Sequence, residues 1–477
     1  MNPAEIKYAY FLGIGGIGMS AIARYFHARG ISVAGYDKTP SDLTRELEAE
    51  GMMVTYEDSP ATLPGFVLAH AENTLLVYTP AIPADHKQLL TLRAMGKTLY
   101  KRSEVLGMIS RDAYCIAVAG THGKTTTSTL IAHLLYACNI NFTAFLGGIS
   151  ANYNTNYIHK TDGNNLFQDK PVVVLEADEF DRSFHRLSPD IAVITAIDPD
   201  HLDIYGTPEA FFEAFEIFAS KIKPGGTLIA NAHLEQHWPE NTEVLEYCMD
   251  SGMAPDFHSM FAQISQGNFL FDYIGIRKKN GEIHASDLQQ LYCGLPGFHN
   301  IENATAALAV CMDMLNLDPE QIRNGLAQFR GVKRRFEFIV KTEKYVVIDD
   351  YAHHPEELNA ILTSVKELYP DKKLTAIFQP HLFTRTRDFA EGFAHSLSIP
   401  DELILMEIYP ARELPIEGIH SAWLLQQIQL PEKQKSLLNT ENILQKIRSE
   451  KPELLLILGA GDIDRIVPLV KELYNEN

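Results

Sequence analysis

The sequence has few cysteines, no long apolar run and no excess of positive charge, and each absence excludes a class of protein. The five cysteines are widely spaced, and no CxxC pair occurs among them, so neither a disulfide framework nor a structural zinc site is expected. No uninterrupted apolar stretch approaches the roughly 20 residues that span a bilayer. The formal net charge of -20 argues against nucleic acid or an anionic membrane as the main partner.

The remaining composition is that of an ordinary globular protein. Hydrophobic residues make up 46% of the chain and charged residues 21%, so a folded chain is expected. The opening segment, MNPAEIKYAY, lacks the basic-then-apolar pattern of a secretory signal. We therefore expect a cytoplasmic protein whose partners are small molecules rather than nucleic acid or membrane. The oligomeric state is left open.

Short apolar runs alternate with amphipathic stretches, which is typical of α/β domains with parallel sheets. At 477 residues the chain is too long for one core, and we divide it into residues 1–108, 109–330 and 331–477. The part from about Gly226 to Gly294 is polar and irregular, and alternation at Phe269–Ile274 indicates a small antiparallel addition. A helix is expected at Ile301–Leu315. The predicted strands are Tyr8–Ile14, Ile31–Tyr36, Leu75–Thr79, Cys115–Ala119, Val172–Glu176, Ile191–Ile197, Tyr345–Asp349, Leu374–Phe378, Leu403–Met406 and Leu454–Leu458.

The segment GTHGKTT, from Gly120 to Thr126, is the sharpest motif in the sequence. A strand leads into it and a helix leads out, so its backbone N–H groups and the helix N-terminus can face an anion. Lys124 supplies a cation, and the Thr125 hydroxyl can ligate Mg²⁺. The common pattern GxxxxGK[ST] needs a glycine where Val118 stands, so the loop is a shortened variant. A chance Gly-Lys-Thr at a helix start is the alternative; the flanking pattern favours an ATP site.

Two acidic clusters follow predicted strands downstream of this loop. Glu176, Asp178 and Glu179 come after one strand, and the segment from Asp198 to Asp203, which includes His201, comes after the next. Strands of an α/β sheet present ligands at their carboxyl ends, and Mg²⁺ prefers hard oxygen donors. Solvated loops are the ordinary alternative for such clusters, and a lone histidine such as His201 is more often structural. Their placement after buried strands favours a metal site.

A second glycine motif, GxGxxG, runs from Gly13 to Gly18 between a predicted strand and a helix. Asp37 ends the next strand, about 20 residues further on, as in the dinucleotide-binding fingerprint. Read alone, the motif indicates an NAD-dependent oxidoreductase. Physically it specifies only the close approach of backbone to a pyrophosphate, which UDP-linked sugars also carry.

The shortened loop, together with the EADE and DHLDIYG segments, resembles that of the Mur ligases and the folylpolyglutamate synthetases. Both join an amino acid to a carboxylate at the expense of ATP. The resemblance implies a Rossmann-like UDP-sugar-binding domain, a central P-loop ATPase-like domain and a Rossmann-like C-terminal domain that binds the amino acid. The extension from Gly15 to Ala23 resembles the alanine-adding branch, which implies UDP-N-acetylmuramate and L-alanine as substrates. A recycling ligase that attaches a tripeptide to the same nucleotide sugar is the closest competitor.

The resemblance assigns roles to individual residues. By it, Glu176 and His201 hold Mg²⁺ with Thr125, and Lys124, Glu176 and His201 are catalytic. Arg335 in the segment GVKRRF contacts the nucleotide, with Arg334 as a near alternative, and His353 lies near the adenine or the reacting groups. The implied ATP-binding residues are Gly120, Thr121, Gly123, Lys124, Thr125, Thr126, Asn300, Asn303, Arg335 and Asp350. The implied UDP-sugar-binding residues are Gly13, Gly15, Gly16, Gly18, Met19, Ser20 and Asp37.

Two points in this assignment stay open. Asn300 also stands where a helix N-cap would, which is its structural alternative. His381 and Arg385 are suited to a small zwitterionic amino acid, whose carboxylate needs a cation. The family's commoner QPHRYTR pattern has Arg and Tyr where this chain has Leu382 and Phe383. The amino-acid pocket is therefore not specified in detail.

The implied reaction begins with attack of the sugar-borne carboxylate on the γ-phosphate of ATP. An acyl phosphate forms, and the free amine of the amino acid then displaces phosphate from it. Lys124 and Mg²⁺ neutralise the charge that develops on the transferred phosphoryl group. Two readings from other classes compete: an NAD-dependent dehydrogenase built on the first glycine motif, and a nucleotide sensor without catalysis.

Overall fold

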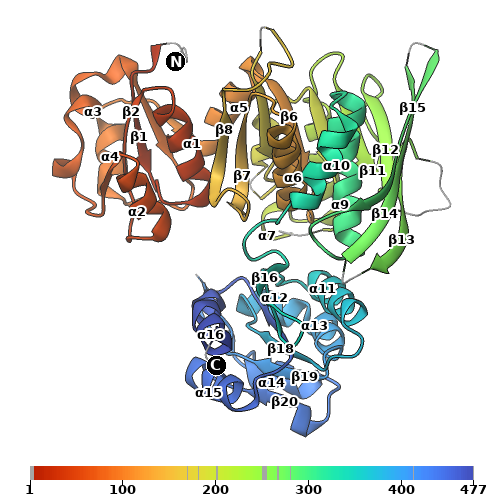
Figure 1. Cartoon of the computed structure of the whole chain (residues 1–477). Helices are drawn as coiled ribbons and strands as arrows, with labels where there is room; N and C mark the ends of the chain where they lie inside the picture. Colours follow the sequence, from red (N-terminus) through yellow and green to blue (C-terminus); the bar gives the residue numbers. More distant parts are fainter. Residues whose placement is uncertain are drawn as a thin grey trace. The chain divides into compact units, whose positions relative to one another are not determined.

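Three β-sheets, each with its own helices, make up the computed structural model (Figure 1). The structure describes residues 5–168, 170–180, 182–199, 202–249, 255–265, 268–279, 281–411 and 413–475. These form two compact units. Unit 1 comprises Met1–Met260, Asp272–Leu291 and Glu302–Phe329, and unit 2 comprises Phe261–Phe271, Tyr292–Ile301 and Arg330–Asn477. Within the described part, no helix is long and apolar enough to cross a bilayer.

The first sheet of unit 1 is parallel throughout, with the order β3-β2-β1-β4-β5. This order confirms the Rossmann-like prediction. β1 ends at Leu12 rather than Ile14, because the N–H groups of Gly13 and Ile14 both turn to the carbonyl of Tyr36, at 2.7 and 3.0 Å. The strands are β1 Tyr8–Leu12, β2 Ser32–Tyr36, β3 Met53–Thr55, β4 Thr74–Tyr78 and β5 Leu99–Lys101. The helices are α1 Ile17–His27, α2 Asp42–Ala49, α3 Gly65–Ala69, α4 Lys87–Ala94 and α5 Arg102–Asp112.

The central sheet has ten strands in the order β15-β14-β13-β12-β11-β10-β6-β9-β7-β8. The predicted antiparallel addition is not separate, because β11, β12 and β13 continue the same sheet in parallel pairing. The strands are β6 Tyr114–Ala119, β7 Phe142–Ser150, β8 Thr155–Lys160, β9 Val172–Glu176, β10 Ile191–Ile194, β11 Thr227–Asn231, β12 Glu243–Met249, β13 Phe257–Ser265, β14 Asn268–Lys279 and β15 Glu282–Tyr292. The helices are α6 Lys124–Ala137, α7 Leu202–Tyr205, α8 Pro208–Ala219, α9 Phe298–Leu308 and α10 Pro319–Gln328.

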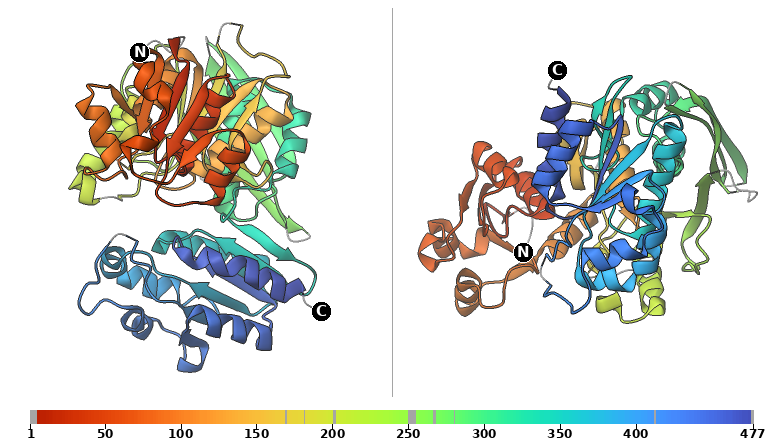
Figure 2. Two further views of the ribbon diagram at one scale, coloured as in Figure 1. Left: turned by 90° about the vertical axis from the view of Figure 1, so that its left-hand side faces the viewer. Right: turned by 90° about the horizontal axis from the view of Figure 1, so that it is seen from below.

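The third sheet belongs to unit 2 and has the order β16-β17-β21-β18-β19-β20. Every pair in it is parallel except β16 with β17. Figure 2 shows helices on both faces of this sheet, as in doubly wound folds. The strands are β16 Glu337–Lys341, β17 Val346–Asp350, β18 Leu374–Phe378, β19 Glu402–Leu405, β20 Lys435–Leu437 and β21 Leu454–Leu458. The helices are α11 Pro355–Leu368, α12 Phe383–Asp388, α13 Ala390–Ser396, α14 Ser421–Gln427, α15 Thr440–Glu450 and α16 Ile466–Asn475.

Two predicted boundaries fall differently in the structure. The division at residue 108 lies inside α5, so the first two sections share this helix. The helix expected at Ile301–Leu315 begins earlier, as α9, and continues as a π-helical turn, Ala309–Met314. Unit 1 ends at Phe329, and the division into three sections stays a prediction.

A buried polar network joins the first sheet of unit 1 to the central sheet. Asn156 on β8 is fully buried, and its amide donates to the Ser20 hydroxyl at 2.9 Å and to the carbonyl of Ile17. Its side-chain oxygen accepts from the Arg24 guanidinium at 2.6 Å. Arg24 in turn pairs with two glutamates of α2, Glu46 and Glu50. Because Ile17 opens α1, Asn156 fixes the start of the helix that follows the first glycine motif.

Replacing Asn156 by alanine should lower the free energy of unfolding by about 2–4 kcal/mol, because buried donors and acceptors of Arg24, Ser20 and Ile17 would lose their partner. Urea denaturation followed by circular dichroism measures the change. As a control, Asn241→Ala alters an exposed residue and should stay within about 0.5 kcal/mol of the parent. Equal stabilities of the two variants would contradict a structural role for the network.

Candidate active site

The predicted phosphate loop connects β6, at the centre of the ten-stranded sheet, to α6. Gly120 and Gly123 have φ angles of 136° and 79°, in the region that favours glycine. A Cβ atom at Gly120 would collide with the Thr195 hydroxyl, and one at Gly123 would collide with the Asn303 side-chain oxygen. These two glycines therefore permit both the turn and the close approach of β10 and α9.

The segment after β10 holds this loop in shape. The N–H of Thr121 donates to the carbonyl of Ala196 at 2.9 Å, and the N–H of Asp198 donates to the Thr121 hydroxyl at 3.1 Å. The Thr195 hydroxyl donates to the carbonyls of Ala119, at 3.2 Å, and His122. These bonds explain why β10 ends at Ile194 instead of Ile197. The sequence analysis missed Thr195, for which a hydroxyl directly after a buried strand was the available signal.

Lys124, the first residue of α6, lies back over the loop. Its ammonium donates to the carbonyls of Gly120 and Thr121 and forms an ion pair with Glu179 at 2.8 Å. Burial alone would lower the pKa of Lys124, but the carboxylates of Glu179 and Glu176 raise it above its ordinary value. The lysine is therefore charged at neutral pH. Among the described residues, the second oxygen of Glu179 has no hydrogen-bond partner, although it is buried.

The acidic cluster after β9 lies beside the loop. Glu176 ends β9, opposite Val118 in β6, and its carboxylate accepts from the N–H of Gly147 at 3.1 Å. A Cβ atom at Gly147 would collide with that carboxylate, so glycine is required there. Asp178 pairs with Arg102 of α5 at 2.8 Å. Burial would raise the pKa of Asp178, yet the Arg102 guanidinium and the N–H of Phe180 hold it below its ordinary value.

The structure describes two of the three predicted metal ligands, Thr125 and Glu176. Thr125 is half-buried at the start of α6, and Glu176 stands at the same edge of the sheet, where β6 and β9 are adjacent and parallel. Thr126 is buried one residue further along the helix. His201, the third predicted ligand, lies outside the described residues. A hydroxyl and a carboxylate are the hard oxygen donors that suit Mg²⁺.

The two asparagines of α9 have different surroundings. Asn303 accepts from the Thr127 hydroxyl of α6 at 3.2 Å, and its side-chain oxygen lies close to Gly123 of the phosphate loop; its role toward ATP stays a prediction. Asn300 is not an N-cap, because α9 already begins at Phe298. Its amide donates instead to the carbonyl of Pro296 at 2.7 Å, which closes the turn before the helix. The N-cap reading of Asn300 was therefore wrong.

The first glycine motif forms a tight turn at the carboxyl end of β1. Asp37, from the end of β2, accepts from the N–H of Gly15 at 2.7 Å, so this carboxylate closes the turn. A Cβ atom at Gly15 would lie 2.6 Å from a Thr44 methyl carbon, and one at Gly18 would collide with the Arg102 guanidinium. Gly16 precedes α1 as its N-cap residue. The turn is therefore built for close backbone approach, and Arg102 is a cation beside it that sequence reasoning missed.

Met19 and Ser20 do not face this turn's open side. Met19 is 2% exposed and belongs to the hydrophobic core. Ser20 is fully buried, and its hydroxyl donates to the carbonyl of Ile17 at 3.0 Å. Their N–H groups both donate to the carbonyl of Gly16. The two residues support the turn from inside, and the exposed part of the motif is Gly15–Gly18.

In unit 2, Arg334 and Arg335 flank the ring of Tyr351, at 5.3 and 5.2 Å. Arg334 is bound internally, to Asp349 at 3.3 Å and to the carbonyl of Gly459. Arg335 lies 3.7 Å from Glu357, and its side chain is 35% exposed. The preference for Arg335 over Arg334 stays a prediction.

Asp350 ends β17 and is nearly buried. Its two carboxylate oxygens accept from the N–H groups of Phe336, at 2.6 Å, and Ala352, at 2.7 Å. Burial raises the pKa of Asp350 to about 6. The carboxylate thus ties the segment before β16 to the loop after β17.

The predicted amino-acid ligands lie together near the end of β18. The rings of His381 and His353 are 6.2 Å apart, and His381 stacks on Tyr409 at 5.7 Å. Burial lowers the pKa of His353 to about 4, and Arg385 is close enough to lower it further. His353 is therefore neutral at pH 7. Leu382 has a φ angle of 71°, unusual for a leucine, at the turn between His381 and α12.

Comparisons with known proteins agree over nearly the whole chain. Models of the Mur ligase family match three segments: the catalytic domain at residues 8–114, the middle domain at residues 118–311 and the glutamate ligase domain at residues 334–461. A UDP-N-acetylmuramate–L-alanine ligase of Phocaeicola vulgatus is 46% identical over 100% of both chains. One from Parabacteroides distasonis is 47% identical and covers 99% of this chain and 98% of its own.

Solved structures give the same answer for the fold. The UDP-N-acetylmuramate-alanine ligase of Thermotoga maritima is 27% identical, with a TM-score of 0.76, and the match covers 98% of this chain and 99% of that one. A murein peptide ligase of Psychrobacter arcticus is 20% identical, with a TM-score of 0.65 over 99% of each chain. From these matches, and from a shortened phosphate loop set beside a carboxylate cluster, the chain belongs to the Mur ligase family.

Proposed function

We propose that this protein joins L-alanine to the lactyl carboxylate of UDP-N-acetylmuramate, with hydrolysis of ATP to ADP and phosphate, in the synthesis of peptidoglycan precursors. The observation that carries the proposal is the charged Lys124 inside the loop Gly120–Gly123, next to the acidic cluster that ends β9. The full-length relatives named as L-alanine ligases support the choice of substrates. ATP and UDP-sugars are cytoplasmic metabolites, so a cytoplasmic location follows from the proposal.

The phosphate loop is the site for ATP. The N–H groups of a glycine-rich turn and the N-terminus of α6 favour a triphosphate, and Lys124 can exchange Glu179 and the loop carbonyls for phosphate oxygens. Such preorganised charge is most effective where charge develops in the transition state. Asn303 and Thr127 keep α9 against the loop, which supports a nucleotide pocket there.

Mg²⁺ fits the donor set of this site. The Glu176 carboxylate and the Thr125 hydroxyl are hard oxygen donors at one edge of the sheet, and a buried Glu179 oxygen there has no hydrogen-bond partner among the described residues. We infer that Glu176 and Thr125 hold the ion, with His201 as a third ligand. When bound, Mg²⁺ would shield the phosphate charges from the incoming carboxylate.

The chemistry then needs two displacements. The lactyl carboxylate attacks the γ-phosphorus of ATP, ADP leaves, and an acyl phosphate forms. The uncharged amine of L-alanine attacks the acyl carbon, a tetrahedral intermediate forms, and its collapse expels inorganic phosphate while the nitrogen loses a proton. Lys124 neutralises charge on the transferred phosphoryl group in the first step. We assign the turn Gly15–Gly18, with Arg102 beside it, to the diphosphate of the UDP-sugar.

The amino-acid end of the reaction belongs to unit 2. Arg385 offers a cation for the carboxylate of L-alanine; the neutral His353 lies near it, and the ring of His381 is 6.2 Å from that of His353. A recycling ligase that takes a tripeptide would use the same nucleotide sugar and is the second candidate. The fold of this chain permits such an activity, since the murein peptide ligase of P. arcticus has the same overall fold.

Phosphate release with UDP-N-acetylmuramate and ATP, and with one amino acid or tripeptide at a time, tests the proposal. We expect release to depend on L-alanine, to be at least tenfold slower with glycine or the tripeptide, and to stop when Mg²⁺ is removed by EDTA. Turnover that requires the tripeptide would favour the recycling ligase. ATP consumption that needs no amine acceptor would contradict the ligase assignment.

Lys124→Ala should reduce turnover by at least a thousandfold (about 4 kcal/mol of transition-state stabilisation) and leave the fold intact. The steady-state rate of phosphate release and the circular dichroism spectrum measure the two effects. Lys433→Ala, at an exposed position in unit 2, is a matched control and should keep its activity. Retention of more than a tenth of the rate by Lys124→Ala would remove the loop from the mechanism.

A further inference from the structure

A second basic site lies in unit 1, in a cavity of about 370 Å³ between the start of α5, the short 3-10 helix Ser183–Arg186 and the end of α8. Four cationic side chains line it, together with a histidine and two serines, and no carboxylate is among the lining residues. The charged and titratable members are Lys101, Arg182, Arg186, Lys221 and His185. This is unexpected in a chain with 61 acidic residues and a net charge of -20.

The four cations have no carboxylate partner in the described part of the chain. The structure records an ion pair for neighbouring Arg102, whereas none is recorded for Lys101, Arg182, Arg186 or Lys221. Arg182 packs its guanidinium over the ring of Tyr205 at 5.0 Å, a contact that leaves its charge uncompensated. Like charges that converge on one cavity repel one another, so an anion bound there would be stabilised.

Two neutral groups complete the lining. Ser103 lines the cavity and is only 7% exposed, and no hydrogen bond of its hydroxyl is recorded in the described part of the chain. His185 lies 2.9 Å from the carbonyl of Ala214, and burial with nearby Arg182 and Lys221 lowers its pKa. His185 is therefore an uncharged part of the lining, and the Ser103 hydroxyl can donate a hydrogen bond to a ligand.

The cavity is separate from the turn assigned to the UDP-sugar. Arg102 lies between Lys101 and Ser103 in sequence, but its guanidinium is directed at Asp178 and the turn at Gly18. At the start of α5, Arg102 thus contacts the turn at Gly18, whereas its neighbours Lys101 and Ser103 line the basic cavity. The residues that line the basic cavity are not part of the phosphate loop or of the acidic cluster.

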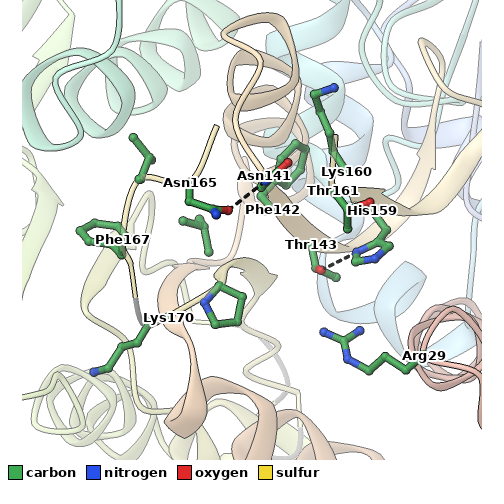
Figure 3. Close-up of a pocket in the computed structure, with 13 residues that line it drawn as sticks. Arg29, Asn141, Phe142, Thr143, His159, Lys160, Thr161, Asn165, Phe167 and Lys170 are labelled. Atoms are coloured by element: carbon green, nitrogen blue, oxygen red, sulfur yellow. Dashed lines mark hydrogen bonds between the residues drawn. The ribbon is translucent and has the colours of Figure 1, made fainter. Parts of the chain in front are cut away.

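Another cavity of the same unit shows what an internally satisfied polar lining looks like (Figure 3). Its volume is about 360 Å³, and four of its polar groups pair with one another: Asn141 donates to Asn165 at 2.9 Å, and Thr143 lies 2.9 Å from His159. Lys160, which also lines it, pairs with Asp162. No such pairing is recorded for the four cations of the basic cavity in the described chain.

We propose that the basic cavity formed by Lys101, Ser103, Arg182, Arg186 and Lys221 binds a polyvalent anion of the phosphate class. Arginine recognises such oxygens in a bidentate manner, and a serine hydroxyl adds a donor at the floor of the site. The source of this chemistry is a free phosphorylated metabolite, because the diphosphate of the UDP-sugar is assigned to the Gly15–Gly18 turn. An anion bound in the cavity would contact the start of α5. Because Arg102 on the same helix contacts the turn at Gly18, the cavity and that turn would be linked.

Inorganic pyrophosphate is the probe, and isothermal titration calorimetry of the full chain without nucleotide is the measurement. The wild type should show a binding component that Arg186→Glu/Lys221→Glu weakens at least tenfold. The matched double reversal Lys433→Glu/Lys471→Glu, at exposed positions in unit 2, changes the net charge equally and should retain that component. Pyrophosphate affinity within twofold of the wild type in Arg186→Glu/Lys221→Glu would overturn the proposal.

A milder variant keeps the test decisive if the double reversal does not fold. Arg186→Gln/Lys221→Gln should still bind pyrophosphate at least threefold more weakly, and an unchanged affinity would overturn the proposal equally. The KM for UDP-N-acetylmuramate in the same variants should stay within twofold of the wild type. A KM that rises with the loss of pyrophosphate binding would overturn the assignment to a free anion. The KM for ATP should stay within twofold in both variants.

Discussion

The phosphate loop depends on one buried ion pair. Lys124 is held by Glu179 and by the carbonyls of its own loop, at the centre of a ten-stranded sheet. A lysine buried without carboxylates would lose its proton, because burial lowers its pKa. Here the carboxylates after β9 keep it charged. The loop can therefore keep its conformation without a ligand. Lys124 stays charged, and its ammonium can bind a triphosphate in place of the loop carbonyls. The positions of β6, β9 and β10 all follow from the need to place these groups together.

The α5 helix connects this centre to the first sheet of unit 1. It starts at the edge of the first sheet and ends where β6 begins, so one rigid element spans both. Through Arg102 it contacts the acidic cluster and the Gly18 turn, and through Lys101 and Ser103 it lines the basic cavity. Asn156 adds a second tie between the same two sheets. Arg102 and Asn156 thus link the turn at Gly18 and the start of α1 to the central sheet.

Local sequence signals predicted most of the framework, and long-range contacts account for what they missed. Strands such as Val172–Glu176, Leu374–Phe378 and Leu454–Leu458 were predicted to the residue, because each is a short apolar run with clear ends. The glycines of both motifs were found because they too are signals local in the sequence. Arg102, Thr195 and Asn156 were not, since their partners are distant in sequence. Asn300 was misread because the helix start depends on the Gly297 turn. The assigned ligand roles, including that of His201, remain predictions.

The central claim is that the loop directs a phosphoryl group from ATP to the lactyl carboxylate. Synthesis with UDP-N-acetylmuramate whose carboxylate carries ¹⁸O tests it most directly, with mass spectrometry of the released phosphate. Because the acyl phosphate bridges carbon and phosphorus through a carboxylate oxygen, each released phosphate should contain one oxygen from the labelled carboxylate. Phosphate free of ¹⁸O, formed while the amide product accumulates, would contradict the account.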